Sequence, residues 1–160
     1  MGKVSIIMGS QSDLNIVKET VDILKELKIP FEVRVLSAHR TPKELVKYVE
    51  GASKRGVKVF IAAAGMSAAL PGVIASHTLF PVIGIPVESS NLKGLDALLS
   101  IAQMPPGVPV GCMSIGKAGA KNAAIFAAEL IALNNKSLLK KLNKYKAGMR
   151  KKISKLKIKL

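Results

Sequence analysis

Tryptophan is absent from the 160 residues of this chain, and aromatic residues make up only 4% of it. Nearly half of the residues (49%) are nevertheless apolar, so the core must be built mainly from Ile, Val, Leu and Ala. Small side chains of this kind suit closely packed parallel strands and helices. A chain of this length is expected to form one domain with a substantial core.

Cysteine is nearly absent as well. The single Cys112 lies in an apolar stretch, which excludes an internal disulfide and indicates a cytosolic protein. No signal peptide is recognisable, and no continuous apolar stretch reaches the roughly 18 residues that a membrane-spanning helix needs. We therefore expect a cytoplasmic protein that is not exported and does not bind or span a membrane.

Acidic residues are missing from residues 136–160, which hold 11 Lys or Arg. This tail carries most of the net charge of +15, because residues 1–135 contain 14 basic and 10 acidic residues. A nucleic-acid-binding function would have to depend on the tail, since the body of the chain is close to ordinary in charge.

Apolar strands alternate with amphipathic helices over residues 1–135. Such alternation predicts a parallel sheet with helices on both faces and right-handed crossovers. The expected fold is α/β, a flavodoxin-like three-layer αβα sandwich with five parallel strands. The strands are expected at residues 3–8, 31–36, 57–63, 80–86 and 110–115, and the helices that follow them start near residues 14, 42, 73, 94 and 118.

The segment Ser37-Ala-His-Arg-Thr-Pro42 stands between the second expected strand and a helix. Thr41 and Glu44 match a capping box, and Pro42 suits the first position of the helix. The segment is therefore a short loop at the carboxyl end of a strand, where open α/β sheets bind ligands.

The side chains in this loop can carry out acid–base chemistry and bind an anion. Imidazole titrates near neutral pH, so His39 is a candidate for proton transfer. Arg40 can hold a phosphate through two parallel hydrogen bonds, and Ser37 adds a hydroxyl. The alternative is that His39 and Arg40 are ordinary polar loop residues held by carbonyl groups and an ion pair.

Two further loops follow expected strands. Residues 9–13 contain Ser10, Ser12 and Asp13, and either Ser12 or Asp13 is expected to cap the next helix. Residues 64–72 are mostly small, so the backbone could approach a ligand closely, although a tight strand–helix crossing would also need small residues. Because all three loops follow parallel strands, they should share one edge of the sheet, which predicts a ligand site there.

The tail forms a second segment, predicted to be a basic amphipathic C-terminal helix over residues 136–160. Its apolar residues recur every three or four positions, which predicts one apolar stripe that needs another surface to cover it. A neighbouring subunit is the preferred partner, ahead of an anionic membrane or nucleic acid. The stripe consists of Leu138, Leu142, Tyr145, Met149, Ile153, Leu156 and Leu160.

Four motifs together resemble one enzyme family in both order and spacing. They are Met8-Gly-Ser-Gln-Ser-Asp13, Ser37-Ala-His-Arg-Thr-Pro42, residues 64–72 (Ala-Gly-Met-Ser-Ala-Ala-Leu-Pro-Gly) and residues 103–110 (Gln-Met-Pro-Pro-Gly-Val-Pro-Val). The chain resembles the N5-carboxyaminoimidazole ribonucleotide mutases of purine biosynthesis. The related aminoimidazole ribonucleotide carboxylases share the first two motifs.

The resemblance implies a three-layer fold, a homo-octamer with active sites between subunits, and a C-terminal helix that packs on a neighbour. It implies a ribonucleotide substrate and an isomerase activity that moves a carboxyl group from the exocyclic nitrogen to ring carbon four, without a metal or other cofactor. His39 matches the catalytic histidine. The matching substrate-binding residues are Ser10, Ser12, Asp13, Ser37, Arg40, Gly65, Met66, Ser67, Ala68 and Leu70.

One residue departs from the family pattern. The mutases usually have a histidine where this chain has Ala69, so the carboxyl group could come from the carbamate or from free carbon dioxide. A carboxylase that uses carbon dioxide directly is therefore the alternative activity. Two other classes stay open from the residues alone: a nucleotide-binding module without catalysis, and a nucleic-acid binder that acts through its tail.

Overall fold

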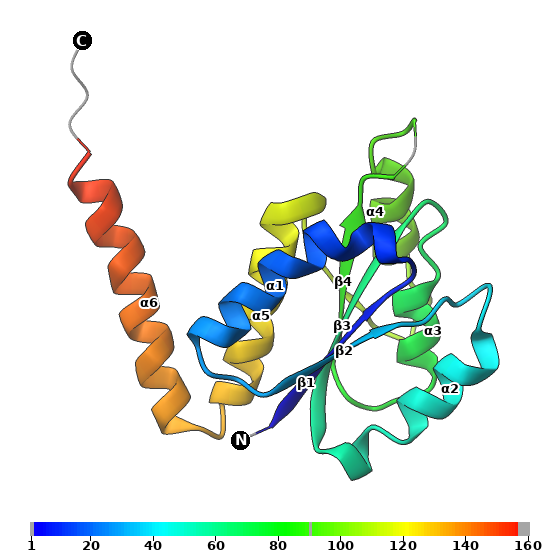
Figure 1. The fold of residues 1–160 in the computed structure, drawn as a ribbon, viewed down its shortest axis with the longest axis horizontal. Coiled ribbons are helices and arrows are strands. Elements are labelled where there is room, and N and C mark those ends of the chain that lie inside the picture. The colour runs from blue at the N-terminus through cyan, green and yellow to red at the C-terminus, as the bar shows by residue number, and fades with distance from the viewer. Residues whose placement is uncertain (1, 90, 157–160) are drawn as a thin grey trace.

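The computed structural model describes residues 2–89 and 91–156. Five parallel strands form one sheet in the order β2-β1-β3-β4-β5, and helices cover both of its faces (Figure 1). This confirms the predicted flavodoxin-like sandwich. The strands are β1 (Lys3–Met8), β2 (Phe31–Val35), β3 (Val57–Gly65), β4 (Val82–Val87) and β5 (Gly111–Cys112). The helices are α1 (Leu14–Glu26), α2 (Pro42–Glu50), α3 (Leu70–Ser76), α4 (Leu95–Ala102), α5 (Gly116–Ala132) and α6 (Lys136–Ser154), with the 3₁₀ turns η1 (Gln11–Asp13) and η2 (Ser53–Arg55).

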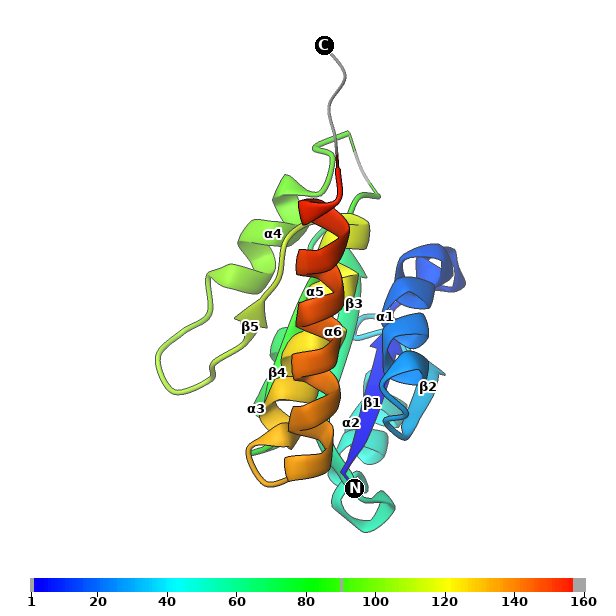
Figure 2. The same cartoon turned by 90° about the vertical axis from the view of Figure 1, so that its left-hand side faces the viewer.

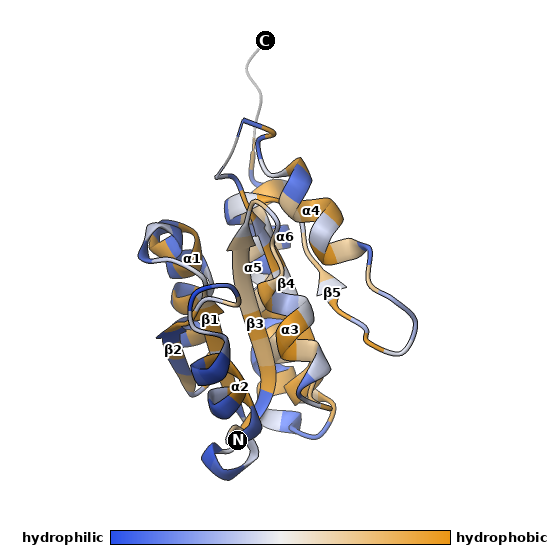
Figure 3. Ribbon diagram, turned by 90° about the vertical axis from the view of Figure 1, so that its right-hand side faces the viewer, coloured by the Kyte–Doolittle hydropathy of each residue, from blue (hydrophilic) through white to orange (hydrophobic). Residues whose placement is uncertain are grey.

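Each face of the sheet has its own apolar core, because alternate strand residues point to opposite faces. Helices α1 and α5 cover one face, where Ile6, Ile61 and the alanines of α5 are buried. Helices α2, α3 and α4 cover the other, around Phe60, Leu45 and Ile74. Figure 3 shows the hydrophobic colouring concentrated on β3 and the helix α3 beside it.

Several predicted boundaries differ from the structure, most of all at the last strand and at α3. The last strand was expected over residues 110–115, but only Gly111–Cys112 pair with β4. The chain turns into α5 at Gly116, which has a φ of 74°, instead of continuing along the sheet. This turn is tight, because a β-carbon on Gly119, in the first turns of α5, would lie 1.6 Å from the carbonyl oxygen of Ser114 just before the helix. Helix α3 also begins earlier than expected, at Leu70.

The predicted tail helix exists over the described part of the tail, and its apolar stripe divides into two halves. Leu138 and Leu142 are 1% and 3% exposed and belong to the core beside α5, so these two residues need no neighbouring subunit. Met149, Ile153 and Leu156 are 42%, 71% and 74% exposed. Figures 1 and 2 show α6 running beside α5 and leaving the domain toward its C-terminal end. Leu160 lies outside the described residues.

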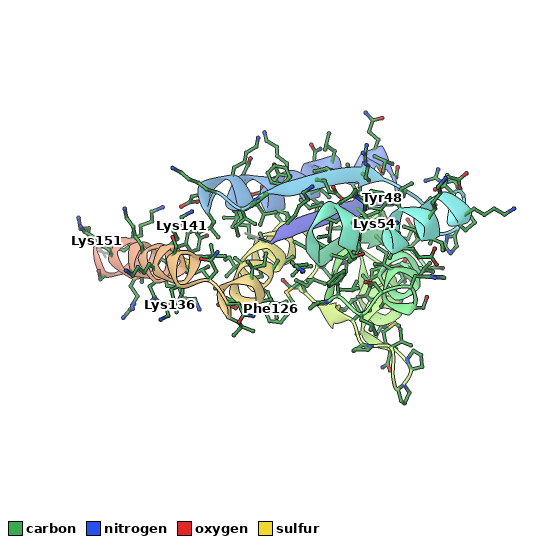
Figure 4. The ribbon with its side chains drawn as sticks, turned by 90° about the horizontal axis from the view of Figure 1, so that it is seen from below. Tyr48, Lys54, Phe126, Lys136, Lys141 and Lys151 are labelled. Atoms are coloured by element: carbon green, nitrogen blue, oxygen red, sulfur yellow. The ribbon has the colours of Figure 1, made fainter. Side chains whose placement is uncertain are left out.

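The lysines of α6 are spread along the part of the molecule that lies far from α2. Figure 4 shows Lys136, Lys141 and Lys151 on α6, well away from Tyr48. Lys141 donates a hydrogen bond of 2.8 Å to the Leu27 carbonyl, which ties α6 to the end of α1. Within the described residues, no helix combines the length and the apolar character that crossing a membrane requires.

A polar network joins α2 to the edge of the sheet. The Tyr48 hydroxyl donates to Glu32 (2.5 Å) and lies 2.8 Å from the Ser5 hydroxyl. Arg55 donates to Glu32 (3.1 Å), and its guanidinium lies 4.1 Å from the centre of the Tyr48 ring. Burial raises the pKa of Glu32, but the hydrogen bonds from Tyr48 and Arg55 and the charges of Arg55 and Lys3 outweigh it and leave the pKa below its usual 4.5.

Replacing Glu32 with Gln should therefore cost stability in a pH-dependent manner. A carboxylate whose pKa is lowered by folding stabilises the native state above its usual pKa and loses that contribution as the pH falls through the folded pKa. We expect a loss of about 1–3 kcal/mol at pH 7, typical of hydrogen bonds to a charged group, and a smaller difference from wild type below pH 4. Urea unfolding at both pH values measures this. Glu26→Gln, at an exposed position on α1, is the control; a pH-independent loss in Glu32→Gln would contradict the argument.

Candidate functional site

The carboxyl ends of four neighbouring strands meet at one edge of the sheet. Met8 of β1 pairs with Val35 of β2 and with Ala63 of β3, and Gly65 of β3 pairs with Val87 of β4. The loops that leave these strands therefore start side by side. This confirms that the three predicted loops share one edge, and we call it the carboxyl rim.

The loop after β1 folds around the Ser10 side chain. The Ser12 backbone N–H and the Ser12 hydroxyl both donate to the Ser10 hydroxyl oxygen (3.3 and 2.9 Å). In return, the Ser10 N–H donates to the Asp13 carboxylate (3.2 Å), so the two residues form a capping box. The expectation that Ser12 or Asp13 caps α1 is wrong, because Ser10 supplies the capping oxygen, for η1, and Asp13 makes no side-chain cap to α1.

Asp13 is a buried carboxyl group with only 6% of its surface exposed. Burial raises its pKa above the usual 3.8, although the hydrogen bonds from Ser10 and Ser12 and the charge of Arg40 act in the opposite direction. The structure thus keeps a charge partly desolvated at the carboxyl rim. Such an arrangement is typical of functional sites.

The loop after β2 is closed by Thr41 rather than by the predicted capping box. The Thr41 hydroxyl accepts from the Ser37 N–H (2.9 Å) and donates to the Ser37 carbonyl (3.1 Å), and it makes no cap to α2. The Arg40 N–H donates to the Ser37 hydroxyl oxygen (3.2 Å). Pro42 does occupy the first turn of α2. These bonds present His39 and Arg40 at the exposed tip of the loop.

Arg40 connects two of the loops. Its guanidinium donates a hydrogen bond of 3.0 Å to the Gly9 carbonyl, and its charge acts on Asp13. Since a guanidinium has five N–H donors in a planar fork, donors remain for an anion. The structure therefore brings Ser10, Ser12, Asp13, Ser37 and Arg40 into one connected cluster, with His39 next to it in sequence.

The loop after β3 contributes mostly backbone. Met66 has a φ of 55° and is 60% exposed, and Ser67 is also exposed. The side chains of Ala68 and Leu70, by contrast, are 3% exposed and pack into the core. These two predicted site residues can therefore offer a ligand only their backbone atoms.

Sequence reasoning missed two residues at this edge. Thr41 was assigned as a helix cap, whereas it closes the loop that carries His39. Ser89 follows β4 and lies against Gly65, yet no role was given to its loop. The rule that loops after parallel strands share an edge would have included Ser89, had it been applied to the fourth strand.

A large cavity of about 980 Å³ lies at the other end of the sheet. Its wall includes residues 78–83, at the start of β4, and residues 107–109, and His77 lies beside it. The Nδ1 atom of His77 lies 3.7 Å from the Glu50 carboxylate, in keeping with a surface role. We place the candidate site at the carboxyl rim, because the titratable and hydrogen-bonding side chains converge there. No cluster of three or more His, Cys, Asp or Glu suited to a metal occurs among residues 2–89 and 91–156.

Comparisons with known proteins agree on one family. The model of the family described as AIR carboxylase matches residues 3–152. A relative from Bacillus subtilis, named N5-carboxyaminoimidazole ribonucleotide mutase, is 54% identical over 140 residues, covering 88% of this chain and 86% of that protein. A relative of the same name from Saccharolobus solfataricus is 51% identical and covers 94% of both chains. The crystal structure of Treponema denticola PurE has a TM-score of 0.88 at 30% identity, covering 99% of this chain and all of that one.

The raised pKa of Asp13 leads to a prediction about stability. A carboxyl group whose pKa is raised by folding costs stability wherever it is charged, and this cost disappears as the pH falls through the folded pKa toward 3.8. Asp13→Asn keeps an oxygen that can accept from Ser10 and removes the charge. We expect a higher melting temperature at pH 7 and a smaller advantage at pH 4, each kcal/mol being worth about 2–4 °C in a protein of this size. A lower melting temperature at both pH values would contradict this.

Proposed function

We propose, from the premise that this chain belongs to the AIR carboxylase family, that it is an N5-carboxyaminoimidazole ribonucleotide mutase, an isomerase of de novo purine biosynthesis. It would convert 5-carboxyamino-1-(5-phospho-D-ribosyl)imidazole to 5-amino-1-(5-phospho-D-ribosyl)imidazole-4-carboxylate. The observation that carries the proposal is the convergence of His39, Arg40 and Asp13 at one rim, in a chain about half identical to proteins of that name.

The ribonucleotide would bind across the loops after β1 and β2. Arg40 reaches from one loop to the other, so its remaining N–H groups and the Ser37 side chain are positioned to hold the phosphate. Ser10 and Ser12 would contribute hydroxyl contacts, and the buried carboxylate of Asp13 would accept hydrogen bonds from ribose or from the base. The exposed start of the β3 loop, from Gly65 to Ser67, would lie against the carboxyl group that moves.

His39 would act as both acid and base. As imidazolium it protonates the carbamate nitrogen, the N–C bond breaks, and carbon dioxide is released beside the ring. Ring carbon four then attacks the carbon dioxide, and neutral His39 removes the proton from that carbon. The ring regains its aromaticity, the imidazolium is restored, and no net proton is consumed. Retention of carbon dioxide beside the ring is a proximity effect.

The alternative is a carboxylase that takes free carbon dioxide, and Ala69 in the β3 loop is the observation that favours it. The direct experiment offers the purified protein the carbamate in one assay and aminoimidazole ribonucleotide with bicarbonate in another. Product absorbance is followed in both. Turnover of the carbamate at low bicarbonate supports the mutase. Turnover only at high bicarbonate supports the carboxylase, and binding without turnover of either would leave a nucleotide-binding module.

We also propose that the protein acts as a homo-oligomer, with the octamer that the family resemblance implies as the expected form. Three features of the single chain support an assembly. Residues 103–109 project from the body between α4 and β5 (Figure 2), the large cavity lies beside them, and the outer half of α6 exposes Met149 and Ile153. A cytoplasmic location and a lack of nucleic-acid binding are part of the same proposal.

His39→Asn should reduce turnover by about 100-fold or more while ligand affinity changes little, because the amide keeps some hydrogen bonding and cannot transfer a proton. Steady-state assays and equilibrium binding of the product measure the two effects. His77→Asn, which changes the histidine at the other end of the sheet, is the control and should retain wild-type turnover. A His39→Asn enzyme with near-normal turnover would exclude the proposed mechanism.

Arg40→Lys should weaken binding about tenfold or more and change turnover less. A phosphate contact that is equally strong in the substrate complex and in the transition state lowers the Michaelis constant without raising turnover. Lysine lacks the planar guanidinium that can contact both Gly9 and an anion. Arg150→Lys on the exposed face of α6 is the matched control. Equal affinity of wild type and Arg40→Lys for a ribonucleotide phosphate would count against the assignment.

Replacing Met149 and Ile153 with Ser should reduce the size of the assembly or lower its melting temperature, with little dependence on salt. Apolar burial would carry the contact, at about 25 cal/mol per Å². Light scattering at low and high salt measures this. Leu142→Ser would test the folding of the single chain and not its assembly. Leu142 is buried in its own domain, so its replacement should unfold the chain. Unchanged assembly, together with salt-sensitive binding of wild type to DNA, would favour the nucleic-acid interpretation of the tail.

A further inference from the structure

The loop after β4 is the fourth loop at the carboxyl rim. Gly65, the last residue of β3, pairs with Val87, the last residue of β4. Glu88 and Ser89 therefore leave the sheet directly beside the start of the β3 loop. Both residues are exposed, so their side chains are accessible to a ligand that lies over the rim.

Ser89 occupies the space that a side chain at position 65 would need. A β-carbon on Gly65 would lie 1.8 Å from the Ser89 hydroxyl oxygen and 2.8 Å from the Ser89 β-carbon. Both distances are far below van der Waals contact, so position 65 has to be glycine while Ser89 lies there. The hydroxyl is therefore held against the backbone where the β3 loop begins.

The far end of the same loop is also fixed. Gly94 adopts a left-handed conformation with a φ of 85°, which favours glycine. A β-carbon there would approach Ile115 to 2.8 Å and the Glu88 α-carbon to 3.4 Å. Gly94 thus packs closely beside Glu88, the residue before Ser89.

The Ser89 hydroxyl differs from the serine hydroxyls of the loops after β1 and β2. Those of Ser10, Ser12 and Ser37 all take part in hydrogen bonds that shape their own loops. Within residues 2–89 and 91–156, the Ser89 side chain has no hydrogen-bond partner. An exposed serine hydroxyl can give a ligand one donor and two acceptor positions.

We propose that Ser89 is a further substrate-binding residue, whose hydroxyl donates a hydrogen bond to the carboxyl group of the ligand above Gly65. This rests on the proposed function. The strand order places Ser89, after β4, on the far side of β3 from the loops that carry Arg40 and Asp13. A ribonucleotide with its phosphate at Arg40 would direct its base, and so its carboxyl group, toward β3 and Ser89. The other explanation is that Ser89 only fills space over Gly65.

The test compares two ligands that differ by the carboxyl group. Isothermal titration measures binding of aminoimidazole ribonucleotide and of its 4-carboxylate to wild type and to Ser89→Ala. The alanine keeps the β-carbon that packs on Gly65 and removes only the hydroxyl. We expect affinity for the carboxylate to fall about tenfold to a hundredfold, as for a hydrogen bond to a charged group, with little change for the other ligand and in the melting temperature.

Ser100→Ala is the control, because that hydroxyl bonds within its own helix to the Asp96 carbonyl (2.8 Å). Gly65→Ala is a second variant that displaces the Ser89 side chain, and it should show the same selective loss. Equal affinities of wild type and Ser89→Ala for the carboxylate would overturn the inference, as would an equal loss for both ligands accompanied by a lower melting temperature. Failure of the wild type to bind either ribonucleotide would instead refute the proposed function.

Discussion

Parallel hydrogen bonding among β1, β2, β3 and β4 is the constraint on which the rest of the structure depends. In a parallel sheet every strand ends at the same edge, so the four loops that follow Met8, Val35, Gly65 and Val87 leave the sheet together although they are distant in sequence. The pairing of Met8 with both Val35 and Ala63 fixes the loops after β1 and β2 beside the start of the β3 loop. No residue of the candidate site has to fold on its own, because the buried strands position all of them.

Within that frame, the loops are held by few bonds, and most involve backbone groups. Arg40 joins the β2 loop to Gly9, Thr41 closes its own loop on Ser37, and Ser89 fills the space over Gly65. Bonds to backbone depend little on the identity of the partner, so they leave the outward-facing side chains available for chemistry. The desolvation of Asp13 costs stability in this arrangement, and its network of serine donors offsets part of that cost.

Much of this organisation could be predicted from the sequence, and the failures have physical causes. The first strand was predicted to the residue because both of its faces are buried and its residues form one apolar run. The capping box at Thr41 failed because the same hydroxyl can close a loop on Ser37, and only the folded chain decides between the two. Likewise, the apolar run over residues 110–115 predicts a strand, but only Gly111 and Cys112 pair with β4 before the chain turns into α5 at Gly116. The contact of Ser89 with Gly65, 24 positions away, has no local signal, although the loop of Ser89 follows a parallel strand and so belongs to the same edge.

The predicted helix of the tail is present, but the two halves of its apolar stripe have different surroundings in the folded chain. The same helical periodicity places Leu138 and Leu142 in the core of this chain and leaves Met149 and Ile153 exposed. Sequence alone treats the stripe as one surface with one partner, since periodicity does not report where the domain ends. The lysines between these residues can lay their methylene groups over part of the outer half, yet Met149 and Ile153 remain 42% and 71% exposed. Because this exposed apolar stripe continues directly from an intramolecular one, the basic charge of the tail does not by itself identify what the tail contacts.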